Sequence, residues 1–310
     1  MPMRRGKTGV TAGVAAGLSL VFLVGATGCS SSDDDKTVVG SAGFTESEVL
    51  AQMYKQLLDK GGVKSSVKTV KNRELIEPEL EKGKIAVVPE YAATMAEFLN
   101  VKKNGKDAST NAPVATPDVG ATVTALNTLA GPLGLKTGQP AQAVDQNAFA
   151  VSKDFAAKNN LKTLSDLGKS GVEVKIAAGE ECKTRPFCAP GLEKSYGIKV
   201  SGVDPLGVGT TAAKQAVKEG KDDLVLTTST DATLEQFGLV VLADDKKLQN
   251  ADNILPVVNA KKADKILPLL DKLAPVLTTE DLTNLNKQVD QDRKKPADVA
   301  KAYLKSKGLI

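Results

Sequence analysis

Short apolar stretches alternate with amphipathic stretches along most of this sequence, and that alternation limits the folds open to the chain. Runs with the length of buried strands lie at Lys36–Gly40, Val67–Val70, Ile85–Val88, Asn147–Ser152, Val174–Ala178, Lys199–Val203 and Asp223–Thr228. The stretch after the first run places apolar residues at helical spacing, namely Leu50, Met53, Tyr54, Leu57 and Leu58. Strands that alternate with helices in this way indicate an α/β fold, in which helices cover sheets.

The corners between these strands and helices are the first candidates for a binding site. In α/β folds ligands bind beyond the carboxyl ends of strands, where helix N-termini offer free N–H groups. The polar corners of this kind are Ser41–Glu46, Asn72–Glu74, Glu90–Thr94 and Thr228–Asp231. Within the first corner, Thr45 and Glu48 have the spacing of a capping box and predict a helix start there.

The composition excludes several classes of catalytic and metal site. The chain has no His and only 3 Cys, so it offers no Ser-His or Cys-His pair, no His-ligated metal and no four-cysteine cluster. A hydrolase would need paired carboxylates instead. The adjacent pairs Glu180-Glu181 and Asp244-Asp245 do not fit, because neighbouring residues on a strand point to opposite faces. We therefore expect no enzyme activity, no cofactor and no metal.

The charge balance argues against nucleic acid as a partner. The chain has 41 Lys+Arg and 37 Asp+Glu, and Arg4, Arg5 and Lys7 lie in the first seven residues. The remainder carries 38 basic and 37 acidic residues. A nearly neutral protein lacks the basic patch that phosphate recognition requires.

The first 28 residues have the pattern of a secretory signal. Positive charges at residues 4–7 precede an uncharged, mostly apolar stretch. A membrane-spanning anchor is the alternative, but the apolar centre, Leu18 to Val24, is short for a permanent span. The segment Ala26-Thr27-Gly28-Cys29 resembles a bacterial lipobox, and a polar tether, residues 29–36, follows it. We expect a lipid on Cys29 that holds the mature protein at the outer face of the cell membrane.

Two cysteines remain in the mature chain, and they lie close together at Cys182 and Cys188. Outside the cytoplasm an even leftover pair is most simply a disulfide. The spacing is not Cys-x-x-Cys, so we expect a structural bridge rather than a redox site. It would close a small loop and stabilise the fold by about 2–3 kcal/mol.

Several short motifs follow one another over residues 37–260. They are Gly40-Ser41-Ala42-Gly43-Phe44-Thr45-Glu46, Pro89-Glu90-Tyr91-Ala92-Ala93-Thr94, Asn147–Val151, Lys162–Leu167, Pro190-Gly191-Leu192, Ser229-Thr230-Asp231 and Leu239–Leu242. In their order and spacing these motifs together resemble the solute-binding proteins of glycine betaine/carnitine/choline ABC transporters.

The resemblance implies a two-lobed periplasmic-binding-protein-like fold of type II, with crossover strands between the lobes. Residues 37–142 and 241–310 would form lobe 1, and residues 143–240 lobe 2. A small solute, here a quaternary amine, would bind in the cleft and close the lobes like a hinge. The closed protein, expected to be a monomer, would then dock on an ABC permease whose separate ATPase subunit supplies the energy.

The resemblance also implies which residues would contact the solute. A trimethylammonium group donates no hydrogen bonds, so aromatic rings recognise it through cation–π attraction. Tyr91 matches one of the family's aromatic positions, Phe149 stands where a Tyr is common, and Phe44 and Phe187 are possible substitutes for missing rings. Arg185 lies where the family often holds a carboxylate-binding Arg. The polar contacts expected beside them are Thr45, Asn147, Thr228 and Asp231.

The match also departs from the family pattern, which leaves a second solute class open. Thr228 stands where another Tyr is usual, and no aromatic lies near Asp252-Asn253. Two missing rings would remove roughly 1–4 kcal/mol of cation recognition. The alternative is the same receptor role for a different small polar or aromatic solute. A purely structural envelope lipoprotein is a further alternative, and it predicts two lobes without a ligand-sized cleft.

Overall fold

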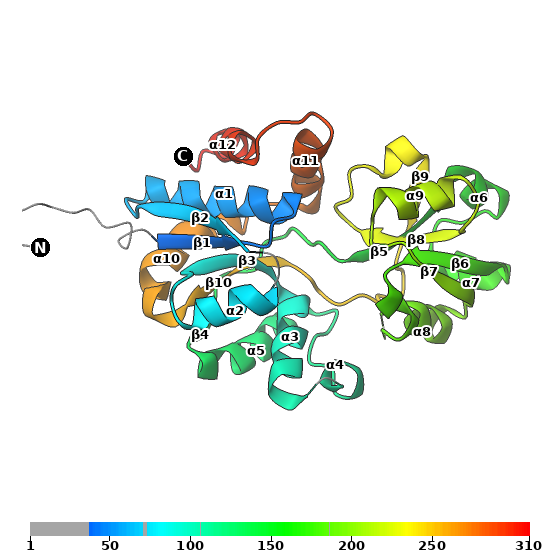
Figure 1. Ribbon diagram of the computed structural model, residues 1–310, viewed down its shortest axis with the longest axis horizontal. Coiled ribbons are helices and arrows are strands. Elements are labelled where there is room, and N and C mark those ends of the chain that lie inside the picture. Colours follow the sequence, from blue (N-terminus) through cyan, green and yellow to red (C-terminus); the bar gives the residue numbers. More distant parts are fainter. Residues whose placement is uncertain (1–36, 71–72, 106, 186) are drawn as a thin grey trace, which may run out of the picture. The chain divides into compact units, whose positions relative to one another are not determined.

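The computed structural model describes residues 37–70, 73–105, 107–185 and 187–310. The predicted signal segment 1–28, the tether 29–36 with Cys29, and Asn72 lie outside these described residues. The described chain is an α/β protein with two five-stranded sheets (Figure 1), as the strand–helix alternation predicts. Among the described residues, no helix has both the length and the apolar character needed to cross a membrane.

The first sheet has the strand order β2-β1-β3-β10-β4. Its strands are β1 (Thr37–Ser41), β2 (Ser65–Thr69), β3 (Val87–Tyr91), β4 (Leu135–Thr137) and β10 (Ile254–Asn259). The strands β2, β1 and β3 are parallel, whereas β10 is antiparallel to both β3 and β4. The carboxyl ends of the three parallel strands therefore lie at one edge of this sheet, and the chain after each of them begins a corner.

Helices cover both faces of the first sheet (Figure 1). One face carries α1 (Thr45–Lys60), α10 (Ala263–Leu270), α11 (Thr279–Asp290) and α12 (Pro296–Ser306). The other carries α2 (Arg73–Glu81), α3 (Ala92–Asn104) and α5 (Val119–Ala130), with the short α4 (Ala108–Asn111) between the last two. The C-terminal helices thus share the core of the first sheet.

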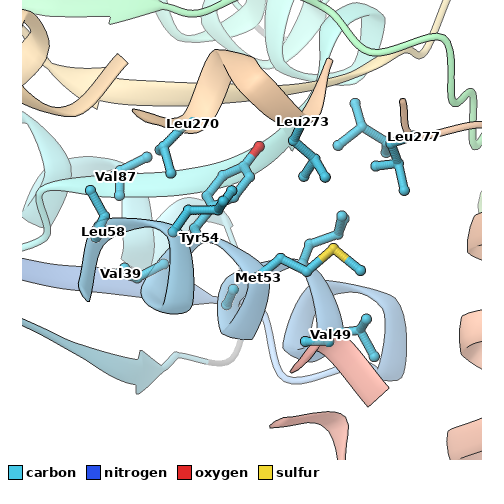
Figure 2. Packing of buried hydrophobic residues seen from close by; sticks show 14 of the residues in the cluster. Val39, Val49, Met53, Tyr54, Leu58, Val87, Leu270, Leu273 and Leu277 are labelled. Atoms are coloured by element: carbon cyan, nitrogen blue, oxygen red, sulfur yellow. The ribbon is translucent and has the colours of Figure 1, made fainter. Parts of the chain in front are cut away.

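The predicted apolar face of α1 forms the centre of the first core. Met53, Tyr54 and Leu58 lie against Val39 and Val87 of the sheet (Figure 2). Helix α1 begins at Thr45, but without the predicted capping box: Phe44 is the N-cap and makes no side-chain capping bond. The Thr45 hydroxyl donates instead to Asp290 Oδ1 (2.5 Å), so this side chain links α1 to the end of α11.

The second sheet has the strand order β7-β6-β8-β5-β9. Its strands are β5 (Asn147–Ser152), β6 (Glu173–Ala178), β7 (Lys199–Pro205), β8 (Leu224–Thr228) and β9 (Leu239–Leu242). The helices around it are α6 (Lys153–Lys158), α7 (Leu164–Ser170), α8 (Ala189–Gly191), which continues into a π-helical turn at Leu192–Tyr196, and α9 (Thr211–Lys218). The disulfide between Cys182 and Cys188 is present in the loop before α8, and both cysteines are buried.

The second lobe extends a few residues beyond the predicted boundary at 240. Strand β9 pairs with β5 as far as Leu242. The Tyr196 hydroxyl then donates to Asp244, and the Gln249 side chain donates to the Phe187 carbonyl (2.9 Å). These contacts keep the chain with the second sheet until about residue 249.

Two crossing segments, residues 138–146 and 243–253, connect the sheets and are hydrogen-bonded to each other. Val144 and Asn253 form an antiparallel bridge, and the Asp145 N–H donates to the Asp252 carbonyl (3.2 Å). The Ile254 N–H donates to the Ala143 carbonyl (3.0 Å). Because the two segments pair antiparallel, Asp145 and Asp252 lie side by side.

We predict that Leu50→Ala destabilises the protein by about 2–5 kcal/mol, since it opens a cavity under α1 in the first core. Leu50 is 1% exposed. Leu75→Ala is the matched control, because it removes the same atoms from a side chain that is 55% exposed. It should change the free energy of unfolding by less than about 0.5 kcal/mol. Urea denaturation followed by circular dichroism measures both, and equal effects would contradict this account of the core.

Candidate functional site

A cavity of about 560 Å³ lies at the carboxyl ends of strands from both sheets. All four predicted strand-to-helix corners contribute to its lining. Its described lining residues include Phe44, Thr45, Glu46, Arg73, Tyr91, Thr94, Asn147, Thr228, Thr230 and Asp231 from or beside those corners. The crossing segments add Asp145, Gln146 and Asp252, and α11 adds Asn286 and Asp290. A cavity of this size fits a small organic solute and counts against a purely structural envelope protein.

Seven of the eight predicted contact residues line this one cavity. They are Phe44, Thr45, Tyr91, Asn147, Arg185, Thr228 and Asp231. The exception is Phe149, which is 1% exposed and lies in the core of the second lobe. Phe149 sits inside β5 between Leu226 of β8 and Leu242 of β9. Asn147 reaches the cavity because it is the first residue of that strand, whereas Phe149 lies two residues deeper in the sheet.

An aromatic pair from the first lobe forms one wall. The rings of Phe44 and Tyr91 stack with their centroids 6.3 Å apart and an interplanar angle of 26°. Phe44 is 46% exposed, so much of its ring is not used in the core. The Tyr91 hydroxyl donates to Glu46 Oε1 (2.8 Å), and burial together with the Glu46 charge raises the pKa of Tyr91. Tyr91 therefore stays protonated, and its ring is fixed from the hydroxyl end.

The Glu46 carboxylate connects this wall to the C-terminal helices. Glu46 lies in the first turn of α1 and is buried. Its Oε1 accepts from Tyr91, and its Oε2 accepts from the Asn286 side chain of α11 (2.8 Å). A carboxylate at a helix N-terminus is also favoured by the helix dipole. The predicted corner residues thus depend on α11, some 240 residues later in the chain.

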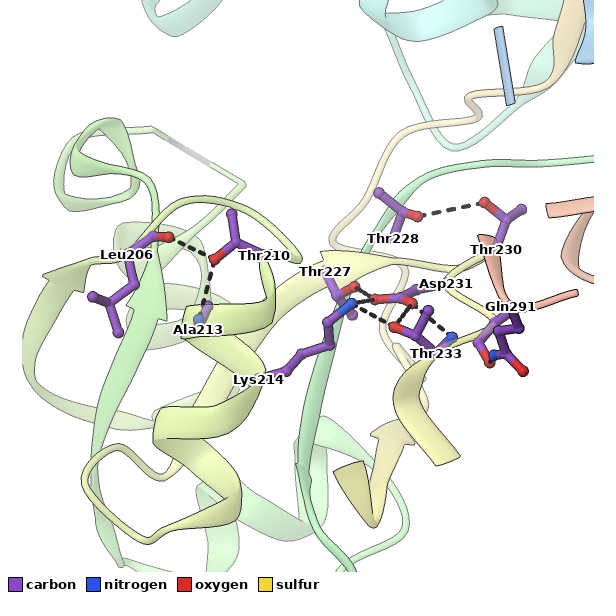
Figure 3. A network of polar contacts seen from close by, with 11 residues as sticks. Leu206, Thr210, Ala213, Lys214, Thr227, Thr228, Thr230, Asp231, Thr233 and Gln291 are labelled. Carbon is purple, nitrogen blue, oxygen red and sulfur yellow. Dashed lines mark hydrogen bonds and ion pairs between the residues drawn. The ribbon is translucent and has the colours of Figure 1, made fainter. Parts of the chain in front are cut away.

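The wall from the second lobe is rich in threonine and organised around Asp231 (Figure 3). Asp231 Oδ2 accepts from Thr227 (2.6 Å) and from the Lys214 ammonium (2.9 Å), and Oδ1 accepts from Thr233 (2.6 Å). Burial opposes the charged form, but these hydrogen bonds lower the pKa of Asp231. Asp231 is therefore a charged carboxylate with hydrogen bonds to both oxygens, and it holds the loop after β8 in place. Its polar neighbours Thr228 and Thr230 lie at the cavity wall beside it.

The floor of the cavity carries two carboxylates from the crossing segments, which the sequence did not single out. Burial and the charge of Glu46 raise the pKa of Asp145 to about 7, although Thr230 and Thr228 oppose the shift. Burial raises the pKa of Asp252 to about 6, against hydrogen bonds from Thr94. The Thr94 N–H donates to Asp252 Oδ1 (2.8 Å). Only the pairing of the crossing segments reveals these acids as neighbours, because they are more than 100 residues apart in the sequence.

Arg73, from the second predicted corner, lines the cavity but is already paired. Its Nε and one terminal nitrogen donate to the two oxygens of Glu90 (2.8 and 2.6 Å). Burial disfavours the charged guanidinium, yet the Glu90 carboxylate raises the pKa of Arg73. A bidentate pair of this kind holds α2 against the end of β3. In the described part of the chain, no group of three acidic or cysteine side chains is arranged to hold a metal ion.

Comparison with known proteins identifies the family. The model for the substrate-binding domain of ABC-type glycine betaine transport systems matches residues 35–306. The chain belongs to this family. The family is one of substrate-binding domains, and the fold of the chain is the two-lobed one expected from the motifs.

Individual relatives agree with this assignment. The chain is 29% identical over 283 residues to the glycine betaine-binding protein YehZ of Escherichia coli, covering 87% of this chain and 90% of that protein. The solved structure of apo YehZ matches with a TM-score of 0.70 at 25% identity and covers 89% of this chain and 99% of that one. The carnitine transport binding protein OpuCC of Listeria monocytogenes is 30% identical over 162 residues. That match spans 50% of this chain and only about half, 51%, of the Listeria protein.

We predict that Asp145→Asn raises the melting temperature at pH 8 and flattens its dependence on pH. The folded protein binds the Asp145 proton more tightly than the unfolded chain, because the pKa of Asp145 rises from 3.8 to about 7 on folding. The wild type should therefore lose stability as pH rises from about 4 to about 7, by up to about 1.4 kcal/mol per pH unit from this group. Asp252 also lowers the stability as pH rises to about 6, and because it is unchanged in the variant, part of the pH dependence should remain.

Thermal melts from pH 5 to pH 8 measure this effect. Asp264→Asn is the control, since it makes the same chemical change at a fully exposed side chain of α10. If the melting temperatures of wild type and Asp145→Asn depend on pH in the same way, folding does not raise the pKa of the Asp145 carboxyl.

Proposed function

We propose that this protein is an extracytoplasmic receptor lipoprotein that binds a quaternary ammonium solute between its lobes and delivers it to an ABC permease. The observation that carries the proposal is the stacked Phe44–Tyr91 pair at the wall of the cavity. Each well-placed ring contributes about 0.5–2 kcal/mol to the binding of such a cation, and more where water is excluded. The glycine betaine and carnitine relatives support the same solute class.

The remaining predicted residues complete the proposed site. Thr45, Asn147, Thr228 and Asp231 lie on the cavity walls, where they would contact the solute directly or hold the groups that do. Arg185 lies on the same cavity and would meet a carboxylate on a solute that carries one. Phe149 is not part of the proposed site, because its ring is buried in the second core.

Closure of the lobes around the solute is the proposed signal to the permease. The Gln291 side chain, just after α11, donates to the Ala232 carbonyl of the second lobe (2.8 Å). Asp290, the last residue of α11, lines the cavity beside it. A solute that contacts both walls would stabilise the closed arrangement by its differential affinity for it.

A different small polar solute is the second candidate, and the threonine-rich wall favours it. Thr227, Thr228, Thr230 and Thr233 line the cavity where a further aromatic ring was expected. Hydroxyl groups recognise a neutral hydrogen-bonding solute better than a trimethylammonium group. Calorimetry with glycine betaine, choline, carnitine and proline betaine separates the candidates, since binding of none of the four would favour the second.

We predict that Tyr91→Ala weakens binding of the preferred quaternary amine by about 2- to 30-fold, the equivalent of one lost cation–π contact. Tyr91→Phe is the matched variant, because it keeps the ring and removes only the hydrogen bond to Glu46. It should bind more tightly than Tyr91→Ala. Isothermal titration calorimetry measures both affinities, and wild-type affinity in Tyr91→Ala would remove the aromatic wall from the site.

We also predict that Cys29→Ser releases the protein from the membrane fraction of the cells that produce it. The reason is that the lipid proposed for Cys29 would be the attachment of the mature chain to the membrane. Fractionation with immunoblotting checks the distribution, and Ser30→Ala serves as a control one residue away. Unchanged membrane association of Cys29→Ser would contradict lipidation at this residue.

A further inference from the structure

The cavity walls carry more acidic than basic side chains. Of the described residues that line the cavity, five are acidic and three are basic. The acidic residues are Glu46, Asp145, Asp231, Asp252 and Asp290, and the basic residues are Arg73, Arg185 and Lys214. A solute that enters this cavity therefore meets a field that favours positive charge.

Two of the three basic residues already have acidic partners. Arg73 forms its bidentate pair with Glu90, a buried residue outside the cavity lining. Lys214 is buried and donates to Asp231 Oδ2 (2.9 Å) and to the Thr233 hydroxyl (2.5 Å). The Arg73–Glu90 and Lys214–Asp231 pairs are each close to neutral, so Glu46, Asp145, Asp252 and Asp290 remain as the other acidic groups of the lining.

Among the acids that line the cavity, Asp145 accepts hydrogen bonds from Thr228 and Thr230 but keeps one oxygen without a donor. Its Oδ1 is buried and has no hydrogen-bond donor among the described residues. The charged and titratable groups around the floor are Glu46 from α1, Tyr91 from β3, and Asp252 with its neighbour Arg73. The Tyr91 hydroxyl donates to Glu46, and Thr94 donates to Asp252, so neither of these donors serves Asp145 Oδ1.

We propose that the cavity selects an organic cation that carries a hydrogen-bond donor and no carboxylate, with the donor facing Asp145, and that it rejects zwitterions of the same size. The inference rests on the proposed receptor function and narrows its solute class to choline-like compounds. The trimethylammonium group lies against Phe44 and Tyr91, and the hydroxyl at the other end supplies the donor that Asp145 lacks. A zwitterion would instead add a carboxylate to a cavity with excess negative charge.

Binding of such a cation is linked to proton release. Without a solute, burial and the charge of Glu46 raise the pKa of Asp145 to about 7, and burial raises the pKa of Asp252 to about 6. A positive charge beside these carboxyls favours their ionised forms and lowers both pKa values. At pH 6.5 the complex should therefore release up to about one proton per cation bound. A zwitterion with its carboxylate toward Asp145 would take up protons instead.

The decisive experiment titrates the wild-type protein with choline and with glycine betaine at pH 6.5 and at pH 8. The two compounds share the trimethylammonium group and have nearly the same length. The difference between their affinities therefore measures the effect of exchanging the hydroxyl for a carboxylate. We expect choline to bind at least about tenfold more tightly. Titrations in buffers with different ionisation enthalpies should show proton release with choline at pH 6.5 and much less at pH 8.

Three substitutions locate the effect, one of them a control. Asp145→Asn should weaken choline binding by about tenfold, abolish most of the proton release and leave glycine betaine no weaker than before. Asp264→Asn, at the exposed position used above, should change neither affinity. Arg185→Gln tests the opposite account, because a site built for a carboxylate would lose affinity for glycine betaine with this substitution.

The outcomes separate this inference from the proposed function. Tighter binding of choline with proton release supports both. Tighter binding of glycine betaine, with loss on Arg185→Gln, overturns the charge inference and leaves the receptor for quaternary amines intact. Absence of binding by either compound, and by carnitine and proline betaine, overturns both. The comparison of the two solutes uses the wild type alone, so it holds even if Asp145→Asn fails to fold.

Discussion

The antiparallel pairing of the two crossing segments is the constraint on which the rest of the site depends. Hydrogen bonds between residues 143–145 and 252–254 tie the two crossing segments between the sheets to each other. The same pairing places the side chains of Asp145 and Asp252 next to each other on the cavity floor. The crossing segments and a pair of half-buried acids are therefore one structural feature, and any solute held by these acids contacts those segments.

Those acids are costly to the fold and useful to the site for the same physical reason. Burial disfavours the charged carboxylate, which is why the pKa values of Asp145 and Asp252 rise to about 7 and about 6. A hydrophobic pair would make the crossing segments more stable, but it would give a polar or charged solute no group to bind. Groups with strongly shifted pKa values tend to lie at functional sites, because a site keeps polar groups that reduce the stability of the fold. The fully paired Asp231, with its lowered pKa, shows the contrasting case of a carboxylate used to build a wall.

The aromatic residues show how position along a strand decides between core and site. Asn147 and Phe149 lie two residues apart on β5 and so project from the same side of the sheet. The cavity lies at the end of the sheet, so only the terminal residue reaches it, and Phe149 packs among the side chains of β8 and β9. Tyr91 and Phe44 occupy strand-to-helix corners and keep their rings at the cavity. The family resemblance predicted that Phe149 contacts the solute, and it did not account for this depth.

The sequence by itself determined the α/β class, the apolar face of α1 and the four corners that line the cavity. These follow from local patterns, because hydrophobic period and strand–helix order act within a few residues. Only the tertiary structure decided that Thr45 bonds to Asp290 instead of capping its helix, that Glu46 is held by Asn286, and that Asp145 lies beside Asp252. These contacts join residues more than 100 positions apart, so their partners are set by how the sheets and the C-terminal helices pack, which no local pattern encodes.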